Sequence, residues 1–196
     1  MKTKAFTTFN LVRTAILSAL AAILFLFEFP VFPAVPFLQL DFSNVPVMLG
    51  AYAMGPIQGS MILLIKSLTG LLHSTSAGVG ELADFIIGMA FVLPGALIYR
   101  MKKTRSRALI GLLTGVLTMI IAAIIVNYYI LFPFFSKIVP YEVIVSMGQA
   151  VFPFIRNVWH FLLTVTASFN FIKGIALCFV TYILYKPLSP LLKDKI

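Results

Sequence analysis

Apolar residues run along this chain in long stretches, which prolines, glycines or clustered charges interrupt at a few points. An apolar stretch of about 20 residues is the length that crosses a bilayer as a helix. Gly-Pro pairs and closely spaced prolines mark the places where such helices end. The pattern predicts an all-α integral membrane protein, a single membrane domain over residues 1–196 with six transmembrane helices at about 9–29, 45–54, 57–73, 81–99, 108–132 and 169–187.

The second of these helices is predicted to be short. Residues 45–72 are apolar enough to form one span, but Gly55 and Pro56 lie inside that stretch. Because Gly-Pro is a strong turn signal, we divide the stretch into a short helix over 45–54 and a longer one over 57–73.

Residues 143–166 allow two interpretations. They are apolar enough to cross a membrane, although Arg156, Asn157 and His160 lie among them. Cytoplasmic segments of membrane proteins carry an excess of lysine and arginine. If this segment does not cross, the N-terminal tail, the basic loop at 100–107 and the C-terminal tail all face the cytoplasm. We therefore predict a long outer loop between helices five and six, with one or two interfacial helices anchored by Trp159. In this topology both termini are cytoplasmic, with the tail charges at Lys2, Lys4, Arg13, Lys186, Lys193 and Lys195.

Composition and charge agree with a membrane location. The chain is 61% hydrophobic and 11% charged, whereas a soluble domain is about a quarter charged. Its mean hydropathy is +1.05. The formal net charge of +9 is concentrated at the ends of apolar stretches, which indicates a role in membrane topology and not a nucleic-acid interface.

Polar residues from four separate parts of the sequence are predicted to meet near the outer surface. An apolar setting with a few convergent polar groups is typical of a small-molecule pocket. Asparagine both donates and accepts hydrogen bonds, and a lysine can donate to a carbonyl or a ring nitrogen. Together with nearby aromatic rings, such groups would suit a flat ring with alternating carbonyl and N–H groups. The residues are Gln39 and Asp41, Glu81 and Asp84, Asn127 and Tyr128, and Asn170 and Lys173.

Each of these positions also has a purely structural interpretation. The two asparagines could tie helices together, and Lys173 could extend to the lipid headgroups. Glu81 and Asp84 could stabilise the start of the fourth helix. Lys66, in the middle of the third helix, has no evident partner, so a buried structural contact and a role in coupling both stay open. His73 is most simply interfacial.

The first helix carries a stripe of small residues, Ala15, Ser18, Ala19 and Ala22. Small stripes let helix backbones approach closely in lipid. The stripe would serve either packing within this protein or docking of a separate membrane partner.

Catalytic and metal-binding signatures are absent from the sequence. It contains no phosphate-binding loop, no H-E-x-x-H, no cysteine pair and no G-x-S-x-G. Glu81, Asp84 and His73 could suggest an intramembrane enzyme, but no nucleophile or metal set accompanies them. A stand-alone secondary carrier is a further alternative, although we find no inverted repeat. We therefore expect binding without catalysis, metal or cofactor.

Four segments resemble the substrate-binding S components of energy-coupling factor (ECF) vitamin transporters, and among these the riboflavin-specific ones. They are residues 37–46, 78–83, 127–133 and 169–174. The resemblance extends over nearly the whole chain. It implies six membrane helices with cytoplasmic termini in a bacterial plasma membrane. It also implies that the protein captures riboflavin as a transported substrate for ATP-driven uptake; an S component for a different vitamin is the alternative.

The resemblance further implies roles for particular residues. Asn127, Asn170 and Lys173 would hydrogen-bond the isoalloxazine ring, and the loop of Leu38, Gln39, Leu40 and Asp41 would cover it. Ala15 and Ala19 match the alanine motif that meets a transmembrane coupling (T) protein, and we expect Ala22 of the same stripe to belong to that docking surface. Two ATPase subunits would complete a complex that delivers the vitamin by tilting or toppling of this chain.

Overall fold

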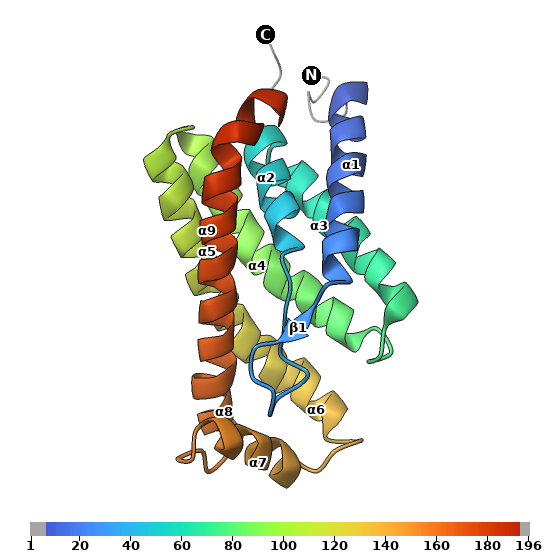
Figure 1. Ribbon diagram of the computed structural model, residues 1–196, viewed down its shortest axis with the longest axis vertical. Coiled ribbons are helices and arrows are strands. Elements are labelled where there is room, and N and C mark those ends of the chain that lie inside the picture. Colours follow the sequence, from blue (N-terminus) through green and yellow to red (C-terminus); the bar gives the residue numbers. More distant parts are fainter. Residues whose placement is uncertain (1–6, 193–196) are drawn as a thin grey trace.

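Helices make up most of residues 7–192, the part of the chain that this computed structural model describes (Figure 1). Lys2, Lys4, Lys193 and Lys195, predicted to lie in the cytoplasmic tails, are outside the described residues. The longer helices are α1 (Thr8–Phe25), α2 (Asn44–Met54), α3 (Pro56–Gly70), α4 (Val79–Met101), α5 (Arg105–Val126), α7 (Tyr141–Val151) and α9 (Ala167–Leu192). Short helical pieces are η2 (Leu71–His73), η3 (Asn127–Leu131), α6 (Phe132–Phe135), α8 (Val158–Phe161) and η4 (Leu162–Thr166).

Within the described residues, four continuous helices are long and apolar enough to cross a membrane: Thr8–Phe25, Val79–Met101, Arg105–Phe135 and Val158–Tyr185. The first of them ends at Phe25, four residues before the predicted end. α2 and α3 contain 11 and 15 residues, fewer than the roughly 20 that a span needs. The chain turns between these two at Gly55, whose φ of 112° favours glycine, and Pro56 then begins α3.

α2 occupies the centre of the bundle. Nine of its eleven residues are buried, and it packs against α1, α3, α4 and α9. Its Tyr52 hydroxyl donates to the Ala108 carbonyl at 2.9 Å, which ties α2 to the start of α5. α2 is short, and its neighbours continue further along the bundle beyond one of its ends (Figure 1).

The α4–α5 contact depends on glycine. A Cβ atom added at Gly115 would lie 2.4 Å from the Phe91 carbonyl oxygen, and one at Gly111 would lie 2.7 Å from that of Gly95. Such close approach of two backbones is possible only where side chains are absent or very small. These glycines therefore set the distance between the two helices.

The end of the bundle away from the start of α1 is closed by the α1–α2 loop and by the segment from α6 to α8 (Figure 1). The loop contains a small antiparallel ribbon of β1 (Phe29–Pro30) and β2 (Gln39–Leu40). Its Phe37 ring stacks on Phe135 of α6 and Phe161 of α8, with ring centroids 5.9 and 6.2 Å apart.

Residues 143–166 do not form one continuous helix. α7 ends at Val151, irregular backbone follows, and α8 then starts a helix that continues through η4 into α9. The last long helix therefore begins about eleven residues before the predicted start at 169, and the second half of the ambiguous segment belongs to it. Trp159 in α8 is half exposed and stacks on Tyr128 at 4.4 Å.

Candidate ligand-binding site

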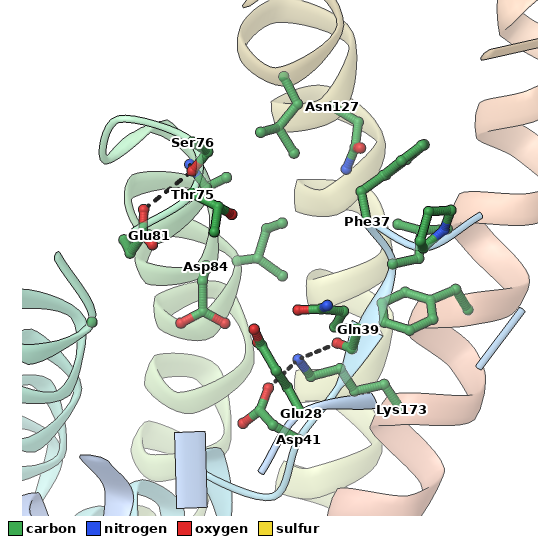
Figure 2. Close-up of a pocket in the computed structure, with 18 of the residues that line it drawn as sticks. Glu28, Phe37, Gln39, Asp41, Thr75, Ser76, Glu81, Asp84, Asn127 and Lys173 are labelled. Atoms are coloured by element: carbon green, nitrogen blue, oxygen red, sulfur yellow. Dashed lines mark hydrogen bonds and ion pairs between the residues drawn. The ribbon is translucent and has the colours of Figure 1, made fainter. Parts of the chain in front are cut away.

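A cavity of about 540 Å³ lies under the α1–α2 loop at this end of the bundle (Figure 2). α4 forms one wall, and the end of α5 with η3, α6 and α9 form the others. Of the nine residues predicted for the site, seven line this cavity: Leu38, Gln39, Asp41, Glu81, Asn127, Asn170 and Lys173.

Leu40 and Tyr128 are not among the lining residues. Successive residues of a strand point to opposite faces. Gln39 of β2 therefore faces the cavity, while Leu40 is buried in the apolar core beneath the loop. The Tyr128 ring instead stacks on Trp159, one residue beyond Asn127 on a different face of the helix.

A buried ion pair joins the loop to α9. Lys173 Nζ lies 2.7 Å from Asp41 Oδ2 and 3.4 Å from the Gln39 carbonyl oxygen. The side chains of Lys173 and Asp41 are 10% and 2% exposed, so Lys173 does not extend to the headgroups. An ammonium has three donors. After these two contacts, one donor is left for a ligand.

The Asp41 carboxyl is held in its charged form. Burial on its own would raise its pKa, but the ammonium groups of Lys173 and Lys66 and the hydrogen bonds from Lys173 and Ser43 lower it below its usual range. Ser43 contributes twice, because its backbone N–H donates to Asp41 Oδ1 at 2.8 Å and its hydroxyl donates to the same oxygen. Asp41 thereby fixes both the end of the loop and the position of Lys173.

Glu28 also lines the cavity and was not among the residues predicted for the site. With the Gln39 amide oriented so that its NH₂ group faces the acid, Gln39 donates to Glu28 Oε2 at 3.0 Å. Burial, and then the neighbouring Asp41 carboxylate, raises the pKa of Glu28. The pairing of β1 with β2 brings Glu28 here, and that pairing has no clear signal in the sequence.

Asn127 and Asn170 direct acceptors toward the cavity. The amide NH₂ of each donates to the carbonyl four residues earlier in its own helix, Ala123 at 2.8 Å and Thr166 at 2.9 Å. Both side chains are buried and both line the cavity. These hydrogen bonds stay within one helix each, so they do not tie helices together. They leave one amide N–H and the oxygen of each asparagine for other partners.

Lys66 has a partner that the sequence did not reveal. Its Nζ lies 2.6 Å from Asp84 Oδ2 and 4.5 Å from the centre of the Phe25 ring. Lys66 is fully buried behind the cavity wall, whereas Asp84 lines the cavity. One turn earlier, Glu81 accepts from Ser74 Oγ at 2.8 Å and Ser76 Oγ at 3.3 Å. These contacts connect α3, the α3–α4 loop and the start of α4.

The charges around the cavity are predominantly negative. Four carboxylates line it, those of Glu28, Asp41, Glu81 and Asp84, and the two ammonium groups that pair with them belong to Lys66 and Lys173. In residues 7–192, no group of three His, Cys, Asp or Glu residues is arranged to hold a metal ion. The arrangement suits a neutral molecule with an apolar body and several hydrogen-bonding groups.

The small-residue stripe of α1 is not part of the cavity lining, and its residues differ in exposure. Ser18 is buried and donates to the Thr14 carbonyl at 2.7 Å, whereas Ala15 and Ala19 are exposed and Ala22 is partly exposed. Ala15 and Ala19 therefore do not serve packing within the described part of this chain.

Comparison with known proteins gives a consistent result. The family model described as "ECF transporter, substrate-specific component" matches residues 9–185. The riboflavin transporter RibU of Staphylococcus aureus (strain TCH60) is 32% identical over 94% of this chain and 92% of its own length. The riboflavin transporter FmnP of Bacillus subtilis (strain 168) is 29% identical over 95% of both chains. A solved structure described as the S component of a bacterial ECF transporter superposes with a TM-score of 0.73 at 31% identity. That match covers 94% of this chain and 98% of the other.

Proposed function

This chain belongs to the family of substrate-specific components of ECF transporters, and from that premise we propose that it captures riboflavin for uptake into the cell. The observation that carries the proposal is the cavity itself. Asn127 from η3 and Asn170 and Lys173 from α9 line it with their polar side chains. Both relatives described above are named riboflavin transporters, which supports riboflavin as the ligand.

The ring of riboflavin suits the polar groups on the α5 and α9 side. Its imide edge offers one N–H donor between two carbonyl acceptors. An asparagine oxygen would accept from the N–H, and a free amide N–H and the Lys173 ammonium would donate to the carbonyls. Apolar side chains, including Leu38, Met119 and Phe169, would cover the faces of the ring. In this arrangement the α1–α2 loop lies over the bound ring.

We place the cavity on the outer side of the membrane. The basic segment from Arg100 to Arg107 lies at the opposite ends of α4 and α5, and lysine and arginine favour the cytoplasmic side (Figure 1). α1 and α9 then start and finish on the cytoplasmic side. Together with α2 and α3 as short membrane-embedded helices, this gives the six-helix topology.

Uptake would require partners. The exposed Ala15 and Ala19 provide a flat surface on α1 for a transmembrane coupling protein, and two ATPase subunits would supply the energy. The chain itself would bind and deliver the vitamin without chemical change.

Binding to the purified protein tests the proposal. Protein prepared from riboflavin-depleted cells should bind one riboflavin per chain, measured by quenching of flavin fluorescence. Absence of flavin binding together with binding of another vitamin would overturn the assignment. Riboflavin uptake by vesicles that contain this chain and no ATPase would instead indicate a secondary carrier.

A further inference from the structure

A cluster of cationic side chains lies where α4 ends and α5 begins, at the end of the bundle opposite the α6–α8 segment (Figure 1). We call residues 100–107 the basic turn. Three residues separate the two helices, and the Thr104 N–H donates to the Lys102 carbonyl at 2.8 Å, so the turn is tight. Its cations are exposed, apart from the last, which is partly exposed. They are Arg100, Lys102, Lys103, Arg105 and Arg107.

No acidic residue neutralises the basic turn within the part of the chain that the structure describes. The sequence contains no acidic residue between Asp84 and Glu142. The carboxylates of Asp84 and Asp41 pair with lysines at the cavity, and none of the described residues forms an ion pair with the cations of the turn. Like charges this close repel each other. A negatively charged partner from outside the chain would therefore lower the free energy of the basic turn.

Exposed apolar side chains border the basic turn on both helices. They are Leu97 and Met101 on α4 and Leu109, Ile110 and Leu113 on α5. Both helices are long and apolar enough to cross a membrane, so these side chains suit contact with lipid hydrocarbon. Leu109 follows Arg105 by four residues, which is about 6 Å along the helix axis. The headgroup layer of a bilayer is roughly 5–8 Å thick on each side. The cations therefore lie at the depth of the headgroups, which favours a lipid over a soluble anion or an acidic protein surface.

We propose that the basic turn binds the headgroups of anionic phospholipids and selects these lipids from the surrounding bilayer. Lysine and arginine lay their apolar stems along the helix and place their charge among the headgroups, where phosphate oxygens accept their hydrogen bonds. Clusters of four to eight such residues beside a membrane helix are typical of binding to anionic lipid. The contact would anchor this end of α4 and α5 at the membrane surface.

The opposite end of the bundle provides an internal comparison. Lys137 and Arg156 are exposed there, and Lys137 is the only lysine or arginine between Arg107 and Arg156 in the sequence. Two isolated cations have no close neighbours with which to attract a shared anionic headgroup. We therefore expect selection of anionic lipid at the basic turn and not at this end.

A tryptophan beside the basic turn tests the proposal. Trp159, the only tryptophan in the sequence, is half exposed at the opposite end. Leu109→Trp combined with Trp159→Phe moves the reporter to the basic turn. Each protein is placed in phosphatidylcholine vesicles that contain some brominated phosphatidylglycerol or some brominated phosphatidylcholine, since bromine quenches tryptophan fluorescence on contact. The reporter at 109 should show about fivefold higher affinity for phosphatidylglycerol, and added salt should reduce this preference. Trp159 in the unmodified chain should show a preference within about twofold.

Neutral variants identify the residues responsible. In the reporter protein, Lys102→Gln, Lys103→Gln, Arg105→Gln and Arg107→Gln together should reduce the preference to within about twofold. Lys137→Gln with Arg156→Gln is the matched control and should leave the preference unchanged. None of these residues lines the cavity, so the result does not depend on riboflavin binding.

Three results would overturn the proposal. Equal quenching by both lipids at position 109 would exclude selection of anionic lipid; loss of uptake in the neutral variant would then assign the turn to an acidic protein partner. A preference that persists in the neutral variant would place its cause elsewhere. If the neutral variant does not fold, the salt series decides, because a preference that about 0.5 M salt does not reduce is not electrostatic.

Discussion

Lys173 and Asp41 are 132 residues apart in sequence, yet Nζ of the first lies 2.7 Å from Oδ2 of the second. This pair connects the α1–α2 loop to α9 at the wall of the cavity. Removing one member of a buried pair leaves the other charge uncompensated, which costs about 3–5 kcal/mol. We therefore expect Lys173→Met to lower the free energy of unfolding in detergent by an amount in this range. Asp41→Leu added to it should restore part of the loss; a double variant less stable than the single one would contradict this explanation.

Glu28 should make stability depend on pH. Its pKa is raised above the usual value of 4.5 by burial and by the Asp41 carboxylate, so in this range the folded protein binds more protons than the unfolded one. The free energy of unfolding should therefore increase as the pH falls from the raised pKa toward 4.5. Thermal unfolding of wild type and Glu28→Gln checks this. The increase should be smaller in Glu28→Gln, and identical pH profiles would contradict it.

The effect of Asp41 on the pH dependence of stability should have the opposite sign to that of Glu28 and should occur at lower pH. Its pKa is held below the usual 3.8, mainly by Lys173 against the effect of burial. Its contribution to stability is complete above 3.8 and is lost only as the pH falls through the lowered value. Comparing the stability of wild type with that of the Lys173→Met, Asp41→Leu double variant checks this. If the stabilising effect of the Lys173–Asp41 pair were already lost at pH 5, the prediction would be wrong.

Asn127 and Asn170 should matter for riboflavin binding, whereas Tyr128 should not. Replacing either asparagine with leucine removes an acceptor from the cavity and should lower riboflavin affinity about tenfold or more. Tyr128→Phe is the control, because the Tyr128 ring stacks on Trp159 and does not line the cavity. Fluorescence titration of the three variants distinguishes them, and unchanged affinity in both asparagine variants would remove them from the site.

Gly115→Ala should destabilise the bundle. The added methyl group would lie 2.4 Å from the Phe91 carbonyl oxygen, so α4 and α5 would have to separate. Overpacking of this kind costs about 1–3 kcal/mol. Leu113→Ala on the same helix is a control, because Leu113 is 49% exposed. Unfolding in detergent should show a lower midpoint only for the glycine variant.

Ala15→Leu combined with Ala19→Leu should separate binding from uptake. Both residues are exposed and do not line the cavity, so riboflavin affinity should stay unchanged. Two larger side chains on α1 should prevent close packing against a coupling protein and abolish uptake by the assembled transporter. Normal uptake by this variant would place the partner surface elsewhere.

Local features of the sequence were sufficient to predict those parts of the structure that depend on neighbouring residues. The Gly55-Pro56 pair marks the turn between α2 and α3, and the family was correctly identified from four short segments. Asn127, Asn170 and Lys173 could be grouped because hydropathy and charge placed them at one level of the bundle. The loop residues Leu38, Gln39 and Asp41 were predicted for the site and line the cavity. Leu40 was predicted with them but points into the apolar core, because successive residues of a strand point to opposite faces.

Contacts between distant elements could not be predicted in this way. Lys66 and Asp84 lie on different helices, and the relative rotation of α3 and α4 decides that they meet. Glu28 reaches the cavity because β1 pairs with β2, and a two-residue ribbon leaves little trace in the sequence.

The proline content of the α1–α2 loop has a kinetic consequence. Pro30, Pro33 and Pro36 each fix one backbone angle, so the released loop has few conformations to explore. Returning to the closed position therefore loses little conformational entropy. We therefore expect the loop, once released, to reclose quickly. The residence time of the ligand would then be limited by how often the loop releases the Lys173–Asp41 pair.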